Sequence, residues 1–257
     1  MINYIKSECY RMRKSSELYL VIAVLGGLTL AMNILLALFG WYTGDLRYST
    51  VRFSLNTFTA SIYIMVMLAA VVSGVLFIED RKNGVLKNIV AYGLEREKLF
   101  VGKCIAAFLH TFFVMCVVLV IYVGSAYLLL ADREWLPLCE MLTGIAALLP
   151  VAASSLICMM VFGMLCRKEI IASVLWMAVY YAVPMAVELA GMKIPVFARI
   201  SSWLPYTFIR SEAVVRYADY NCLWDTPAGF AKCVISGVLG IVIFLAIGVW
   251  RFRKQEF

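Results

Sequence analysis

The sequence holds little charge and little of the chemistry that enzymes use. Only 15% of its 257 residues are charged, 64% are apolar, and His110 is the single histidine. It lacks a G-x-x-x-x-G-K-[ST] motif, so the chain has no phosphate-binding loop of the kind found in P-loop ATPases. Its eight cysteines include no C-x-x-C pair, which is the usual signal of a metal or redox site. We therefore expect no catalytic, cofactor-binding or metal-binding residues in this chain.

An intramembrane hydrolase is the enzyme class that the sequence comes nearest to, and the match is poor. His110 has one candidate partner, Ser73, but the residues around that serine do not form a G-x-S-x-G motif. Glu79 and Asp80 resemble a carboxylate pair, yet the apolar runs hold no second metal-binding cluster. A lone histidine in a membrane more often hydrogen-bonds to a neighbouring helix.

What the sequence has instead is a set of long apolar runs. A soluble domain is nearer half apolar and a quarter charged, so much of this chain's surface needs a non-aqueous solvent. In lipid a segment must satisfy its own backbone groups, and runs of about 20 residues do so as helices that cross a core of about 30 Å. The sequence therefore predicts an all-α integral membrane protein, a six-helix bundle forming one domain over residues 1–257, with spans at about 18–39, 60–78, 104–130, 141–166, 170–189 and 230–250.

The distribution of Lys and Arg predicts which ends face the cytosol. With the N-terminus inside, fifteen Lys and Arg residues lie in cytosolic segments and eight lie outside. That asymmetry follows the positive-inside rule, so both chain ends are expected in the cytosol. The cations border the membrane in short clusters, which indicates contact with anionic lipid and not with nucleic acid. Cys139 and Cys222 both fall outside in this orientation, where they either pair or remain free thiols.

Two further segments have patterns of their own. Apolar residues recur at helical spacing between basic ones in Met1–Glu17, which predicts an amphipathic helix lying on the inner leaflet. Residues 190–227 are too apolar for a free loop and too rich in proline for a span, so short re-entrant helices in the outer leaflet are expected before the last span. Pro150 and Pro184 are expected to kink or break the fourth and fifth spans.

Small residues recur four positions apart in the first two spans. Ala23, Gly27 and Ala31 form one such set, and Ala69 and Ser73 form another. This spacing lets helices approach closely in a membrane. Both sets predict either a contact between subunits or a packing surface within one subunit.

The loop between the second and third spans carries the most specific pattern. It reads EDRKNGVLKNIVAYGLEREK from Glu79 to Lys98. Asn83 is a suitable N-cap, Gly93 is a suitable helix end, and the apolar residues between them fall on one face. The pattern predicts a cytosolic helix of about two turns, which either rests on the membrane helices or fills a groove on a soluble partner.

With these features in this order, the chain resembles the permease subunits of type-2 ABC exporters over nearly its whole length. The broken stretch with Trp203-Leu204-Pro205 is also similar to the region before the last span in that family. The resemblance implies that the charged loop is a coupling helix, which docks on a separate ATPase subunit where ATP and Mg²⁺ bind. The implied contact residues are Glu79, Asp80, Lys82, Asn83, Gly84, Leu86 and Lys87.

The resemblance is closest to the bacterial branch that serves peptide antibiotics of the lantibiotic type. It implies a second permease copy or a sister permease, and export of an amphipathic or peptide-like substrate across the bacterial cell membrane in resistance or immunity. The near absence of ionisable groups within the spans argues against a proton pump or ion channel. An alternative from a different class is a membrane immunity protein that sequesters a toxic peptide without ATP.

Overall fold

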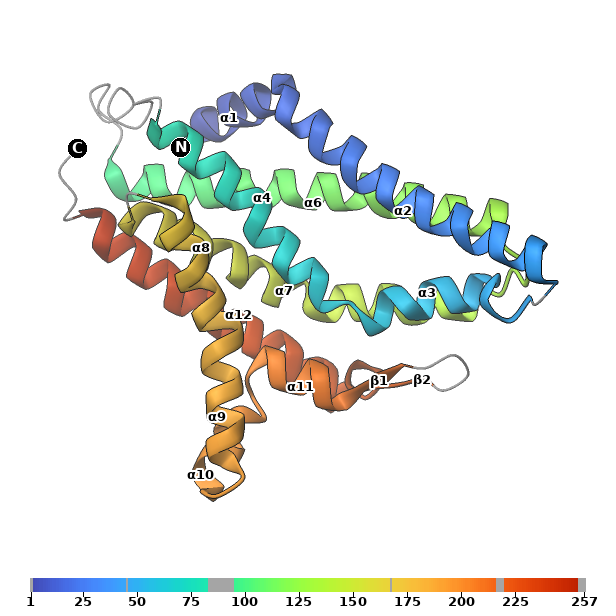
Figure 1. The fold of residues 1–257 in the computed structure, drawn as a ribbon. Coiled ribbons are helices and arrows are strands. Elements are labelled where there is room, and N and C mark those ends of the chain that lie inside the picture. Colours follow the sequence, from blue (N-terminus) through green and yellow to red (C-terminus); the bar gives the residue numbers. More distant parts are fainter. Residues whose placement is uncertain (1, 45, 83–94, 167, 216–219, 254–257) are drawn as a thin grey trace.

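The computed structural model describes residues 2–44, 46–82, 95–166, 168–215 and 220–253 (Figure 1). Helices make up most of this part of the chain. Their bounds are α1 Ile2–Lys14, α2 Ser16–Thr43, α3 Val51–Ala60, α4 Tyr63–Lys82, α6 Arg96–Leu129, α7 Leu136–Leu165, α8 Glu169–Met177, α9 Val183–Gly191, α10 Pro195–Ser201, α11 Pro205–Glu212 and α12 Pro227–Arg253. Short 3-10 turns, η1 Leu46–Tyr48 and η3 Leu223–Asp225, and a π-helical segment, η2 Ala178–Ala182, connect some of them.

The long helices confirm a membrane protein with several spans. Within the described residues, five helices are long and apolar enough to cross a membrane, and the count reaches six if the bent pair α3–α4 forms one span. The first spanning helix, α2, extends past the predicted run of 18–39 because capping residues, and not hydropathy, fix where it begins and ends. The Ser15 hydroxyl accepts a hydrogen bond from the Glu17 backbone N–H at 3.2 Å, and Gly44 ends the helix with φ of 69°.

The second predicted span, 60–78, differs most from the structure. The helical path begins earlier, at Val51, where Thr50 caps α3 through the Phe53 backbone N–H at 3.2 Å. α3 and α4 then meet at an angle of 64°. Thr57 and Thr59 donate their hydroxyls to carbonyls one turn earlier in α3, a bond that weakens the backbone ladder and bends helices. The prediction from hydropathy included only α4, the apolar half of the bent pair α3–α4.

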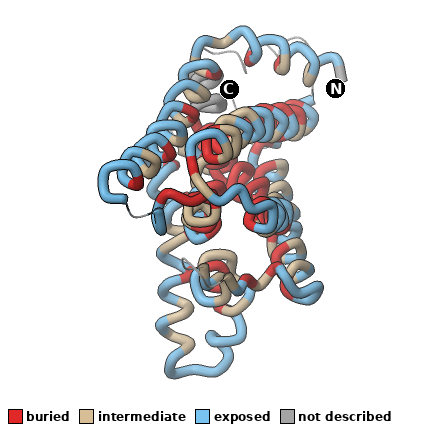
Figure 2. The backbone as a smooth tube through the Cα atoms, turned by 90° about the vertical axis from the view of Figure 1, so that its right-hand side faces the viewer, coloured by how far each residue is buried: buried red, intermediate tan, exposed pale blue. Residues whose placement is uncertain are grey.

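α7 lies at the centre of the bundle, where α4 and α12 pack against it (Figures 1 and 2). In its most apolar stretch 72% of residues are buried, compared with 11% in α2 at the periphery. α7 runs through Pro150 as one helix, and Gly237 of α12 packs against the backbone there. Small residues bring the two helices together because lipid offers no hydrophobic drive for helix association.

The fifth span leaves the bundle. α8 still packs against α7, whereas Figure 1 shows α9 pointing away from the other long helices, and Figure 2 shows that the tip of this arm is exposed. The expected break near Pro184 is present as the π-helical segment Ala178–Ala182 directly before α9. The proline has no backbone N–H to continue the regular ladder, which explains an irregular turn at this point.

The stretch between α9 and α12 contains two short helices, α10 and α11, whose re-entrant position in the outer leaflet stays a prediction, together with a hairpin that the sequence did not predict. Strands β1 Ala213–Val215 and β2 Tyr220–Cys222 pair antiparallel, with Ala213 opposite Cys222. Three-residue strands are too short to show a two-residue alternation. Trp224 is buried behind the hairpin and donates its indole N–H to the Tyr220 hydroxyl at 3.0 Å.

Candidate functional site

One end of the molecule gathers the helix ends that border the predicted coupling loop. α1, the last turn of α4, the first turn of α6 and the last turn of α12 lie there (Figure 1). Arg253 of α12 forms an ion pair with Glu97 of α6, and its carbonyl accepts a hydrogen bond from Arg96 at 3.5 Å. The start of α6 is therefore tied to the end of the last span.

The predicted contact residues divide between the end of α4 and residues beyond the described chain. Glu79, Asp80 and Lys82 belong to the last part of α4. Asn83, Gly84, Leu86 and Lys87 lie outside the described residues, as does the helix predicted between Asn83 and Gly93. Their role as contacts for a partner stays a prediction.

α1 is fastened to α6 by a buried group of charges. The Glu8 carboxylate lies 2.8 Å from the Arg11 guanidinium and 4.0 Å from the Lys103 amine, and both Glu8 and Lys103 are 5% exposed. Tyr4 of α1 packs so closely on Gly102 that a Cβ at that glycine would lie 2.9 Å from the ring. α1 therefore docks on α6, the helix that follows the predicted coupling loop.

The candidate hydrolase residues are engaged by backbone carbonyls. His110 Nδ1 lies 2.8 Å from the Ala106 carbonyl of its own helix. The expected hydrogen bond to a neighbouring helix is therefore not the one that this nitrogen forms. The Ser73 hydroxyl donates to the carbonyls of Ala70 at 2.8 Å and Leu156 at 3.3 Å. These bonds stabilise helices in an apolar medium. Ser73 and Ala69 are buried, so this small-residue set packs within the subunit.

The other small-residue set faces outward. Ala23, Gly27 and Ala31 are all exposed, and a Cβ at Gly27 would meet nothing within 4 Å. The interpretation of this stripe as a packing surface within one subunit is therefore wrong. Cys139 and Cys222, which were expected either to pair or to remain free, are both free thiols in the structure.

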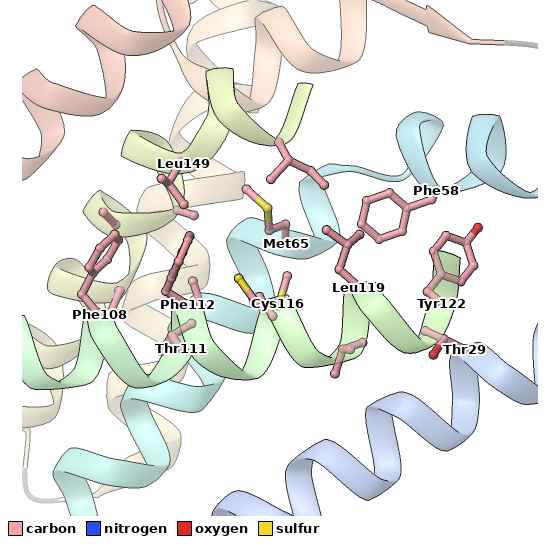
Figure 3. Close-up of a pocket in the computed structure, with 17 residues that line it drawn as sticks. Thr29, Phe58, Met65, Phe108, Thr111, Phe112, Cys116, Leu119, Tyr122 and Leu149 are labelled. Carbon is pink, nitrogen blue, oxygen red and sulfur yellow. The ribbon is translucent and has the colours of Figure 1, made fainter. Parts of the chain in front are cut away.

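A cavity between α2, α4, α6 and α7 is almost wholly apolar. Its volume is about 80 Å³, and Figure 3 shows Phe108, Phe112, Leu119 and Tyr122 following one face of α6 along it. The buried Thr111 hydroxyl has no hydrogen-bond partner among the described residues. A lining with so few polar groups accepts apolar matter but fixes no orientation.

A larger cavity lies between α4, α7, the fifth-span arm, α10, α11 and α12. Its volume is about 550 Å³, and its lining mixes aromatic rings with hydroxyls and one arginine. Tyr63, Tyr180 and Tyr206 supply rings from three different elements, and Arg199 supplies the charge. The sequence did not predict this cavity. The aromatic and basic residues of the 190–227 stretch were the one signal for a binding surface there.

The arrangement is suited to binding and movement. Rings and hydroxyls line the two cavities, and the helix ends that border the predicted coupling loop gather at one end of the bundle. A family model described as ABC-2 family transporter protein matches residues 4–185, which run from α1 into α9. No curated protein is similar enough to count as a match. The match covers well over half of the chain, and the protein therefore belongs to the ABC-2 transporter family.

Proposed function

We propose that this chain is the membrane permease of an ATP-driven exporter and that a separate ATPase subunit supplies the energy. The observation that carries the proposal is the membership of a transporter family in a chain that has no phosphate-binding loop. A membrane component without its own ATP site needs a partner that hydrolyses ATP. ATP and Mg²⁺ would bind to that partner.

The contact with the ATPase is assigned to Glu79, Asp80, Lys82, Asn83, Gly84, Leu86 and Lys87. α4 ends at Lys82 and α6 begins at Arg96, so this segment joins two spans directly. α6 in turn holds α1 through Glu8 and Lys103, and α12 through Glu97 and Arg253. A displacement of the segment by the ATPase would therefore move α4, α6, α1 and α12 as rigid bodies. Packed interfaces transmit small displacements in this way.

A second permease copy, or a sister permease, completes the proposed transporter. The exposed stripe of Ala23, Gly27 and Ala31 on α2 supports a helix contact outside this subunit. Both chain ends are assigned to the cytosol of a bacterial cell, as the distribution of Lys and Arg predicts. The substrate class proposed from the resemblance is amphipathic or peptide-like, in the branch that serves peptide antibiotics.

The assignment of the coupling segment is tested by affinity capture of the tagged chain from its native membrane in mild detergent. The double change Gly84→Pro and Leu86→Asp should abolish capture of an ATPase subunit because it alters two proposed contact residues and places a carboxylate on the apolar face of the predicted helix. Leu136→Asp is the matched control: it places a carboxylate on an exposed leucine at the start of α7. The control should capture as much ATPase as the wild type.

Equal capture by the double variant would remove the coupling assignment. A folded wild-type chain that captures no ATPase would instead favour the ATP-independent immunity protein. Folding of each variant is checked by its elution as a single symmetrical peak in size-exclusion chromatography.

A further inference from the structure

The larger cavity is built around the irregular turn of the fifth span. In the π-helical segment Ala178–Ala182, Tyr180 is buried and its hydroxyl is hydrogen-bonded to Ser154 of α7. The carbonyl of Tyr180 accepts a hydrogen bond from the Tyr63 hydroxyl of α4 at 2.9 Å. Single π-helical turns inside α-helices frequently occur at functional sites. Here the turn joins three elements into one wall of the cavity.

Aromatic rings form a continuous surface on that wall. Tyr63 lies edge-on to Tyr181 at 5.2 Å between ring centroids and to Tyr206 at 5.7 Å, and the Tyr181 and Tyr206 centroids are 5.1 Å apart. Tyr63 and Tyr206 line the cavity together with Trp203, which is 49% exposed. Rigid rings give a large apolar contact area at a low cost in conformational entropy.

The charge of the cavity comes from Arg199. Two other cations on this side of the molecule are paired: Lys232 with Glu212 at 2.6 Å, and Arg210 with Glu188 at 4.0 Å. The Arg199 guanidinium has no ion-pair partner within the described part of the chain. It lies one helical turn before Trp203, and both residues line the same cavity. A guanidinium in such surroundings binds carboxylate, sulfate or phosphate groups through paired hydrogen bonds.

We propose that this cavity binds an amphiphilic anion, with its anionic group at Arg199 and its apolar body against Tyr63, Tyr206 and Trp203. The cavity volume of about 550 Å³ accommodates a ligand of the size that protein pockets usually hold. Arg199, Trp203 and Tyr206 lie beyond residues 4–185, so the family match does not assign them a role. Transport of the anion rests on the proposed permease function, whereas its binding does not.

The smaller cavity offers no comparable site. Its lining holds no charged side chain, so it cannot distinguish an acid from a neutral analogue. This difference gives the proposal its test, because the larger cavity must discriminate by charge.

The test measures binding of a fluorescent fatty acid, dansyl-undecanoic acid, to the purified chain in nanodiscs of phosphatidylcholine. The methyl ester of the same probe is the neutral comparison. The acid should bind about tenfold more tightly than the ester, because its carboxylate forms a charge-assisted hydrogen bond with Arg199 that the ester does not form. Arg199→Gln should remove this preference, and Arg199→Lys should retain part of it because the charge remains.

Lys193→Gln is the matched control, since Lys193 is an exposed cation between α9 and α10 that does not line the cavity. It should leave the preference for the acid unchanged. Equal binding of acid and ester by the wild type would overturn the proposal. An unchanged preference for the acid in Arg199→Gln would also overturn it. An equal loss of that preference in Lys193→Gln would overturn it too, because the preference would then come from the general surface charge and not from Arg199.

A second arm identifies the source of the anion. Nanodiscs that contain phosphatidylglycerol displace the acid if the site takes a phospholipid headgroup, and leave it bound if the site takes a free amphiphile. Either result retains the site, because both require an anion at Arg199. Binding does not involve an ATPase, so a failure of the permease proposal leaves this measurement unaffected.

Discussion

Gly237 of α12 lies directly on the backbone of Pro150 in α7. A Cβ at Gly237 would stand 2.5 Å from the Pro150 carbonyl carbon and 2.5 Å from the Val151 nitrogen. Backbone atoms cannot move aside as the end of a flexible side chain can. This contact therefore fixes how closely the last span approaches the central helix.

Gly237→Ala should lower the free energy of unfolding by about 2 kcal/mol, as overpacking in a tight core does. Gly124→Ala is the matched control, because a Cβ at Gly124 would meet nothing within 4 Å. Both changes raise helix propensity by a similar amount, so the difference between them isolates the clash. Thermal unfolding in detergent measures it. Equal midpoints for the two variants would contradict the close contact.

Asn33 stands at the centre of a buried polar network that joins α2, α3 and α6. Its amide donates to the Tyr122 carbonyl at 3.0 Å and the Ser125 hydroxyl at 2.7 Å, and its carbonyl accepts from the Ser54 hydroxyl at 2.7 Å. Asn33→Leu should lower the free energy of unfolding by about 1–2 kcal/mol, since three buried hydrogen bonds are lost while Ser54 and Ser125 keep only their bonds to Tyr122.

Thr29→Val on the same helix serves as the control for Asn33→Leu. The Thr29 hydroxyl bonds only its own helix, to the Gly26 carbonyl at 2.9 Å. Its loss should change the unfolding midpoint by less than half as much. A larger effect of Thr29→Val would show that the network is not what holds α3 to α2.

Glu8→Gln should weaken the docking of α1 because Lys103 then keeps its charge in a buried position without the facing carboxylate. The expected cost is about 3 kcal/mol, as for breaking a buried pair. Glu95→Gln removes the carboxylate of an exposed pair with Lys98 at 2.8 Å and should cost less than about 0.5 kcal/mol. Unfolding midpoints and the rate of proteolysis after α1 measure both. Equal costs would mean that Glu8 does not fasten α1.

Thiol chemistry tests the packing of the hairpin. Burial raises the pKa of the Cys222 thiol to about 12 from its ordinary 9.0. Only thiolates react with maleimide, so Cys222 should stay unlabelled from pH 7 to 9 in the folded protein and react after denaturation. Since the neutral form is favoured on folding, the stability from this thiol is present below pH 9 and decreases as the pH rises toward 12. Rapid labelling of Cys222 at pH 8 would contradict its burial.

Two other native cysteines test the orientation in the membrane. Cys139, near the start of α7, is exposed, and Cys9 lies on α1 at the other end of the molecule. A membrane-impermeant maleimide should label Cys139 in intact cells and Cys9 only after the membrane is opened. Variants that each retain one of the two cysteines make the labelling unambiguous. Labelling of Cys9 in intact cells would reverse the proposed orientation.

Apolar run length predicted most of the long helices because a span has to satisfy its own backbone groups. It failed where local polar chemistry sets the backbone. Thr50 starts α3 inside a stretch predicted as a loop, and the hydroxyls of Thr57 and Thr59 bond the helix just before the bend. Such bonds depend on side-chain geometry and leave no trace in hydropathy.

The candidate site was predicted only in part. The helix predicted between Asn83 and Gly93 lies outside the described residues and stays a prediction, whereas Glu79, Asp80 and Lys82, expected in the loop before it, belong to the end of α4. The larger cavity escaped prediction because its walls come from elements far apart in sequence, such as Tyr63 and Tyr206. The outward stripe of Ala23, Gly27 and Ala31 could not be placed either, since small residues look alike on an inner and an outer face.

The most direct test of the account is ATP hydrolysis by the material that the tagged wild-type chain captures from its native membrane. The account predicts an ATPase subunit in stable proportion to the chain, with Mg²⁺-dependent hydrolysis that is lost when the same preparation is made from the Gly84→Pro and Leu86→Asp variant. A folded wild-type chain that captures no ATP-hydrolysing subunit would contradict the claim that this permease is driven by a separate ATPase.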